Sequence, residues 1–192
     1  MAVVNHNSSI KIRRCTLSDL DAILAMQEIV IDDLRMKSEF VENIYIPASH
    51  SEIERFLTDD NMCVLGAFVD EEIVAFAVGI FSGYRETVTE LLITERMKSI
   101  LENKRLFWLE ICIVLPAYQN QKLQKRLQSE LLNVALGADI DYVVVTVSPD
   151  NVISLNNLLK DGFRIMDITI YKVEGNAYKR YLMFLKGKST GT

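Results

Sequence analysis

The sequence predicts an α/β fold in which helices flank one central sheet of mixed strand direction. Segments with strand-like and helix-like patterns follow one another in the order β-α-α-β-β-(α)-β-α-β-α-β-β, which gives about seven strands. Two strand-like segments, residues 107–115 and 142–148, are almost continuously apolar, as is typical of strands covered on both faces. Since a helical segment connects them, we expect these two strands to be parallel neighbours.

Composition is that of an ordinary globular protein. Of the 192 residues, 49% are hydrophobic and 24% are charged, and no repeat or low-complexity tract divides them. We therefore expect one domain over residues 1–192, with an ordered core over 8–188. A net charge of −5 gives no general attraction for nucleic acid or anionic membranes, and the apolar runs are too short to span a bilayer. With no signal-peptide pattern, these features favour a cytoplasmic protein.

The cysteines and histidines argue against disulfides and metal ligation. The three cysteines are far apart and lie in apolar segments, so we expect buried free thiols. Two isolated histidines are too few for a zinc site, and we expect no metal. The residues concerned are Cys15, Cys63, Cys112, His6 and His50.

The N-terminal half supplies a strand, two helices and a hairpin, and an insertion follows. Residues 10–16 alternate in polarity as a strand does, and residues 17–36 place apolar side chains at helical spacing. A Ser-x-x-Glu pattern beginning at Ser51 predicts the capped start of a short second helix. Two β-rich runs within residues 62–84 flank an acidic turn and predict a hairpin. Residues 86–106 have a helical composition and predict a helical insertion between strands.

The C-terminal half adds two helices and a final pair of strands around the two apolar strands. Leucines recur at helical spacing within residues 123–136. A shorter helix over 152–161 is closed by Gly162 in a C-cap position. Residues 168–173 and 179–186 are strand-like and are separated by turn residues, so they complete the sheet.

A short turn between the first apolar strand and the next helix has the features of an anion site. Pro116 ends the strand, and an amphipathic helix begins within a few residues. The first N–H groups of a helix lack intrahelical partners and readily bind phosphate. Lys122, Lys125 and Arg126 add positive charge there, which favours a di-anionic ligand. The alternative is a solvated basic helix start on an acidic protein.

Two segments resemble the signatures of the GNAT superfamily of acyl-CoA N-acyltransferases. The first signature is a strand ending in V-x-P, an aromatic residue, and Q/R-x-x-G-x-G/A at a helix start. Lys122 and Gln124 stand here in place of its two small residues. The matching residues are Val114, Pro116, Tyr118 and Gln119.

The second signature is P-x-N-x-x-A-x-x-x-Y followed by G-F. Ser154 replaces its alanine, and Leu158 replaces its tyrosine. The strand order also agrees with the family over nearly the whole chain. The matching residues are Pro149, Asn151, Gly162 and Phe163.

The resemblance implies a mostly antiparallel sheet in which the parallel pair splays apart at a coenzyme A (CoA) site. It implies transfer of an acyl group, most simply acetyl from acetyl-CoA, to a primary amine of a small molecule or peptide. We expect a monomer or homodimer. The backbone near the strand end would bind pantetheine, and the following turn would bind the pyrophosphate. The residues implied to contact the cosubstrate are Ile113, Val114, Gln119, Asn120, Gln121, Lys122, Leu123, Gln124, Lys125, Asn151, Ser154 and Leu158.

The missing glycines are expected to be tolerated. Positions in a first helical turn have ordinary α dihedrals, which Lys122 and Gln124 can adopt. Lys122 could then place its ammonium on the pyrophosphate, whereas Gln124 would push the phosphates outward.

By the same resemblance, the N–H of Val114 would polarise the thioester carbonyl, and Glu110 would accept a proton from the amine. Burial in its strand would raise the pKa of Glu110 toward neutrality. Alternatively, Glu110 is paired at a strand edge with Arg105 or Lys104. Leu158 occupies the place of a tyrosine often taken to protonate the departing thiolate. The alternatives are a slower transferase, a non-catalytic acyl-CoA-binding module that regulates a partner, or a scaffold that has lost CoA.

Overall fold

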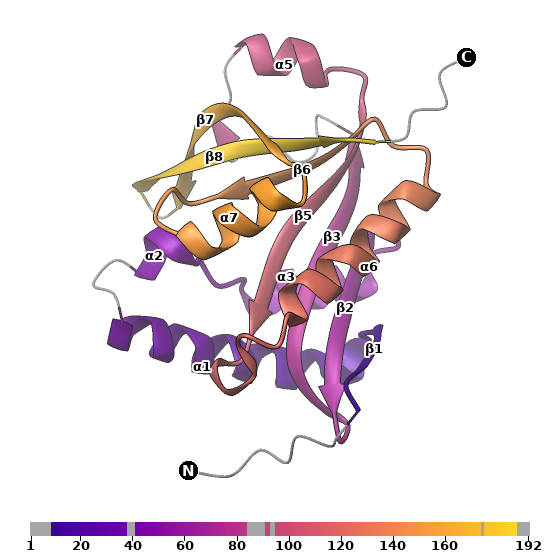
Figure 1. Cartoon of the computed structure of the whole chain (residues 1–192), viewed down its shortest axis with the longest axis vertical. Helices are drawn as coiled ribbons and strands as arrows, with labels where there is room; N and C mark the ends of the chain where they lie inside the picture. The colour runs from indigo at the N-terminus through magenta and orange to yellow at the C-terminus, as the bar shows by residue number, and fades with distance from the viewer. Residues whose placement is uncertain (1–8, 38–40, 84–90, 93–94, 174, 188–192) are drawn as a thin grey trace.

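One mixed sheet of eight strands organises the computed structural model, which describes residues 9–37, 41–83, 91–92, 95–173 and 175–187 (Figure 1). The strand order across the sheet is β1-β2-β3-β5-β6-β8-β7-β4. Of the neighbouring pairs, β5 and β6 are parallel and the others are antiparallel. In chain order the strands are β1 (Lys11–Arg14), β2 (Met62–Val69), β3 (Glu72–Gly83), β4 (Leu91–Leu92), β5 (Arg105–Val114), β6 (Tyr142–Val147), β7 (Arg164–Val173) and β8 (Asn176–Lys186).

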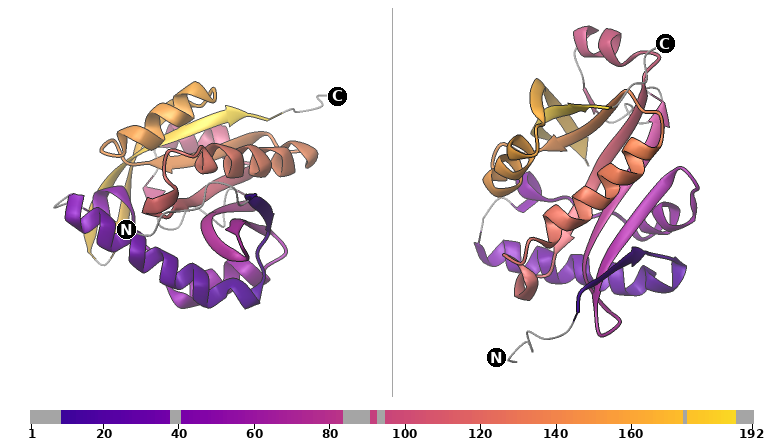
Figure 2. Two further views of the ribbon diagram at one scale, coloured as in Figure 1. Left: turned by 60° about the horizontal axis from the view of Figure 1, so that its bottom comes forward. Right: turned by 45° about the vertical axis from the view of Figure 1, so that its right-hand side comes forward.

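Helices cover both faces of the sheet (Figure 2). Apolar side chains of α1, α3 and α5 pack on one face, in a core that includes Trp108 and Phe184. Leucines of α6 and Leu158 of α7 pack on the other face, around Phe107 and Met183. The helical segments are η1 (Leu17–Asp19), α1 (Leu20–Lys37), α2 (Val41–Ile44), α3 (His50–Thr58), α5 (Glu95–Leu101), η2 (Pro116–Tyr118), α6 (Leu123–Gly137) and α7 (Val152–Lys160).

The predicted fold class is confirmed, including the parallel pair formed by the two apolar strands. Gly162, at φ 92°, ends α7 as expected, and the N–H of Phe163 donates to the carbonyl of Leu158 at 3.0 Å. Among the described residues, no helix combines the length and the hydropathy needed to cross a membrane.

Two local predictions are wrong. The insertion over residues 86–106 is not helical throughout, because Leu91–Leu92 pair with β7 and β5 already begins at Arg105; residues 86–90 and 93–94 lie outside the described part of the chain. The cap of α3 is Ser49 rather than Ser51, with the Ser49 N–H donating to the Glu52 carboxylate at 2.7 Å.

Candidate active site

The parallel strands β5 and β6 separate partway along their length, which opens a gap in the sheet. They are paired only over Leu106–Leu109 and Tyr142–Val145, although β5 continues for five more residues to Val114. At the end of the strand, the N–H of Leu115 donates to the carbonyl of Val74 in β3 at 2.9 Å. Because backbone N–H groups alternate between the two edges of a strand, the Val114 N–H points to the edge that β6 has left.

The same alternation decides which backbone groups face the gap. Ile113 is aligned with Phe76 in the antiparallel β3–β5 ladder, and its peptide groups therefore point toward β3. Ile113, expected to hold pantetheine, thus faces β3, whereas the backbone groups of Cys112 face the gap together with those of Val114. Burial raises the pKa of the Cys112 thiol to about 12.

The turn after β5 leads into a helix start with free donors. The N-cap residue of α6, Lys122, makes no side-chain capping hydrogen bond among the described residues, and the first turn presents N–H groups without intrahelical partners. Asn120 and Lys122 adopt left-handed conformations, with φ values of 66° and 60°. The expectation of ordinary α dihedrals is therefore wrong for Lys122, although Gln124 lies within the helix and has them. Left-handed residues in a turn help successive N–H groups to form an anion-binding concavity.

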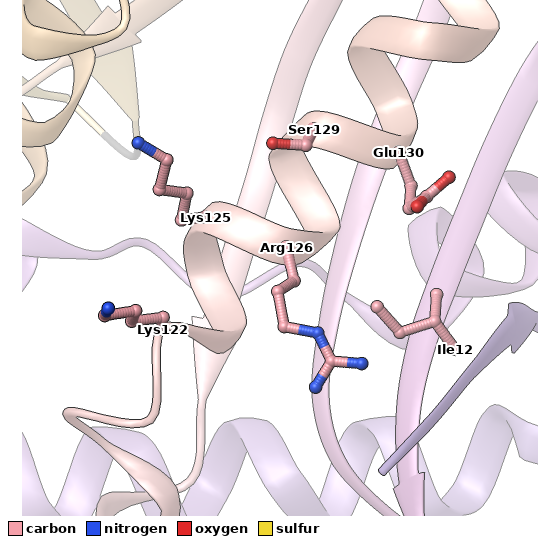
Figure 3. A pocket seen from close by; sticks show the side chains of 6 residues that line it. All are labelled: Ile12, Lys122, Lys125, Arg126, Ser129 and Glu130. Atoms are coloured by element: carbon pink, nitrogen blue, oxygen red, sulfur yellow. The ribbon is translucent and has the colours of Figure 1, made fainter.

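The three cations near this helix start do not act as one cluster. The ammonium of Lys125 forms an ion pair with Asp161 at 3.2 Å, and Arg126 donates to the carbonyl of Ile10 at 3.3 Å. Figure 3 shows Lys122 and Lys125 extending to one side of the helix start, while Arg126 extends toward β1. Within the described part of the chain, Lys122 has no ion-pair partner, which leaves its charge for a ligand. A pocket of about 410 Å³ adjoins them, lined by Ile12, Lys122, Lys125, Arg126, Ser129 and Glu130.

The other residues of the turn differ in what they can offer. Gln119 and Asn120 are exposed, and Gln121 is half-buried, so their side chains lie close to any ligand at the helix start. Leu123, the first residue of α6, is 1% exposed, and its side chain packs in the core on the inner side of the helix. Leu123 can therefore contact a phosphate only through its backbone N–H.

Helix α7 faces the helix start of α6 through polar side chains. Asn151 caps α7 by accepting a hydrogen bond from the Ser154 N–H at 3.1 Å. Gln124 donates to the Ser154 hydroxyl at 3.4 Å and accepts from the Asn157 amide at 3.2 Å. Leu158 is 1% exposed and lies in the apolar core. Its hydrocarbon side chain has no proton to donate to a ligand. Asn157 and Cys112 were missed by sequence reasoning; strand alternation alone, counted back from Val114, could have identified Cys112.

The expectation of a desolvated base at Glu110 is wrong, because its side chain is exposed. In the ladder, Leu109 is aligned with Gly79 and Ile111 with Val78, so Glu110 is the extra residue of a β-bulge. A bulge interrupts the inward–outward alternation that predicted its burial. The basic residues expected nearby form ion pairs elsewhere, Arg105 with Asp139 at 2.6 Å and Lys104 with Asp141 at 4.0 Å.

Comparison with known proteins agrees with this architecture. The family model described as "Acetyltransferase (GNAT) family" matches residues 26–163. Comparison with curated proteins finds no match.

Solved structures similar to the chain are N-acetyltransferases of low sequence identity. NAA60 of Arabidopsis thaliana, in complex with a bisubstrate analogue, is 17% identical with a TM-score of 0.71, over 95% of this chain and 100% of that one. The ribosomal-protein-S18-alanine N-acetyltransferase of Escherichia coli is 14% identical with a TM-score of 0.67, over 95% and 97%. PaiA N-acetyltransferase of Thermoplasma acidophilum, in complex with CoA, is 20% identical with a TM-score of 0.62, over 93% and 99%.

At these identities the structures establish the fold alone, and the family model establishes the family. Membership supports acyl transfer from CoA as the general chemistry of the chain. With the family model matching well over half of its length, this chain belongs to the GNAT family of acetyltransferases.

Proposed function

We propose that this chain transfers an acetyl group from acetyl-CoA to a primary amine of a small molecule or peptide. The observation that carries the proposal is the open edge of β5, where the N–H of Val114 faces the gap left by β6. The uncapped start of α6 follows at the end of the same strand, so one extended ligand with a pyrophosphate can use both. The similar structures of PaiA with CoA and of NAA60 with acetyl-CoA support this choice of ligand.

In the proposed mechanism, the backbone performs the main tasks. Acetyl-CoA supplies an activated thioester. The edge groups of Cys112 and Val114 pair with the pantetheine arm like an added strand, and the first N–H groups of α6 with Lys122 hold the pyrophosphate. The Val114 N–H donates to the thioester oxygen as negative charge develops on it.

The proposed chemical step is a direct transfer to the amine, as in the mechanism of the family. A neutral amine forms the new C–N bond while the C–S bond breaks. Because Leu158 supplies no acid, the sulfur leaves as a thiolate. Departure as an anion is feasible for a thiol with a pKa of about 8.5. The proton lost by the amine passes to water or to the exposed carboxylate of Glu110.

The acceptor class is proposed only as a primary amine. The E. coli enzyme acts on an alanine of a ribosomal protein, and NAA60 was crystallised with a bisubstrate analogue. A peptide α-amine therefore belongs in any first substrate panel, beside polyamines and amino sugars.

Two observations favour a second candidate function, a non-catalytic module that binds acyl-CoA. Leu158 fills the place of the family's acid with a buried apolar side chain. Lys122 and Gln124 also replace the two small residues of the pyrophosphate turn. A module of this kind would bind CoA and release no thiol with any amine.

The test combines ligand binding with thiol release. CoA should raise the melting temperature by about 5–10 °C at about 100 times its Kd, since it binds the folded state alone. An amine panel with acetyl-CoA should then release free thiol. In Val114→Pro, the strand keeps its ladder bonds to β3, because the lost N–H faces the gap, but thiol release should fall about 10²–10³-fold. Absence of any thermal shift at millimolar CoA would refute the proposal, and binding without thiol release would leave the second candidate.

A further inference from the structure

Side chains of α6 and α7 connect across the gap between their preceding strands. The Gln124 amide donates to the Ser154 hydroxyl at 3.4 Å, and its oxygen accepts from the Asn157 amide at 3.2 Å. All three residues are half-buried. The ion pair between Lys125 and Asp161, at 3.2 Å, adds a second connection, from α6 to the C-cap residue of α7.

These connections join the two segments to which the cosubstrate residues are assigned. Helix α6 follows β5, and α7 follows β6, and these are the two strands that separate after Leu109. The proposed cosubstrate residues come from both segments, 119–125 on one side and 151–158 on the other. A ligand held by both segments would lie between them, and the Gln124–Ser154 hydrogen bond joins the same two segments.

We propose that Gln124, Ser154 and Asn157 form a latch that closes the cosubstrate slot in the free protein and opens when CoA binds. The inference rests on the proposed function, because it assigns a regulating contact to the same site. A ligand that binds only the open form has its affinity reduced by the fraction of protein that is closed. The net free energy of one neutral hydrogen bond corresponds to a reduction of about 2- to 10-fold.

The latch differs in its consequences from a simple brace between two helices. Removing a brace loosens the site, so CoA would bind less tightly or equally well. Removing a latch favours the open form, so CoA binds more tightly even though the free protein becomes slightly less stable. The direction of the change in affinity therefore separates the two roles.

Asn157→Ala removes one of the two hydrogen bonds of the latch and keeps the bulk of Gln124. Gln124→Ala removes both bonds from the other helix. The double variant should bind CoA no more tightly than Gln124→Ala, since no bond of the latch is left for the second substitution to remove. Asn156→Ala is the matched control, because the neighbouring amide on α7 is exposed. The Kd of CoA is measured by calorimetry for each protein, and the melting temperature without ligand checks that each is folded.

The expected result is about 2- to 10-fold tighter CoA binding for both single variants and no change for Asn156→Ala. If the parent binds CoA and Asn157→Ala binds no more tightly, the latch is wrong while the proposed function stands. If no protein in the series binds CoA, both are wrong. If the variants bind and the parent does not, both are supported.

Discussion

The left-handed conformation of Lys122 makes it possible to separate backbone strain from charge at the start of α6. An L-residue at φ 60° is destabilised by about 1–2 kcal/mol relative to a right-handed one, and glycine is not. Glycine also gives the unfolded chain more freedom, which offsets up to about 1 kcal/mol of this gain. Lys122→Gly should therefore stabilise the free protein by about 0.5–1 kcal/mol, or about 1–4 °C in melting temperature for a chain of this size.

The charge acts in the opposite direction once a ligand is present. If the Lys122 ammonium lies on the pyrophosphate of CoA, its loss should weaken binding by about 3- to 10-fold at low salt. The effect should shrink near 1 M salt, where exposed charges are screened over about 3 Å. Lys122→Gly is therefore expected to raise the melting temperature without CoA and to lower the affinity for CoA.

Lys122→Ala is the matched control, because it removes the ammonium and keeps the β-carbon that creates the strain. It should weaken CoA as much as Lys122→Gly does and should not stabilise the free protein. Thermal denaturation and calorimetry, each at low and high salt, measure both quantities. Equal melting temperatures for the two variants would refute the argument from strain. Affinities equal to that of the parent would show that the lysine does not contact the ligand.

Three further predictions concern catalysis, pH and packing. Leu158→Tyr should increase thiol release with a competent amine, by up to about 10²–10⁴-fold if the phenol protonates the sulfur, while the Kd of CoA changes little; a folded variant with no gain contradicts the missing-acid argument. Hydrogen bonds from Arg13 hold the pKa of the Asp19 carboxyl below its usual range, so this pair stabilises the fold above about pH 4 and the contribution is lost as pH falls through the lowered pKa. Urea midpoints of the parent and Asp19→Asn should therefore differ most near neutral pH and converge in acid, and a constant difference would contradict the linkage. Gly79→Ala should destabilise by about 1–3 kcal/mol, because the added β-carbon would lie 2.2 Å from a buried phenylalanine ring, whereas Gly137→Ala, with open space around it, should be neutral or stabilising; similar unfolding midpoints for the two would contradict this.

The order of helices and strands could be predicted because burial repeats along each segment. Leucines of α6 and the continuous apolar runs of β5 and β6 carry that periodicity plainly. Prediction from periodicity failed in the insertion, where Leu91–Leu92 form a two-residue strand. This strand is too short to have a pattern of its own and pairs with β7. Prediction from the sequence also misplaced the start of α3, because Ser49 and Ser51 both precede a glutamate by three residues and both fit a capping box.

The elements that carry the candidate site could be predicted from the motifs, but the geometry of individual residues could not. The turn before α6 and the cap of α7 lie where the motifs place them. The exposure of Glu110 could not be read from the sequence, because a β-bulge adds one residue and leaves the apolar pattern on either side unchanged. The left-handed backbone of Lys122 was also missed, since lysine gives no sign of positive φ. The available signal was that the family's signature has glycine at this position. Glycine suits the position because it adopts a left-handed dihedral angle without strain, and not only because it leaves room for the ligand.

At the candidate site the chain differs from the family signatures in its side chains, whereas the proposed mechanism depends mainly on the backbone. In the proposed mechanism Val114 donates through its peptide N–H, Cys112 offers strand-edge groups, and the start of α6 binds anions through N–H groups. A substitution that keeps the backbone N–H therefore leaves these proposed functions in place. Leu158 is different, because the acid in this family is a side chain and its loss removes the whole contribution. A retained oxyanion donor contributes about 10²–10³-fold and a lost general acid about 10²–10⁴-fold. On the proposed function, the chain should therefore bind CoA through an intact backbone framework and transfer acetyl slowly. The rate of this chain should depend more strongly on the pKa of the leaving thiol than the rates of relatives that have the tyrosine do. Measuring the rate with thioesters of more acidic thiols should reveal this dependence.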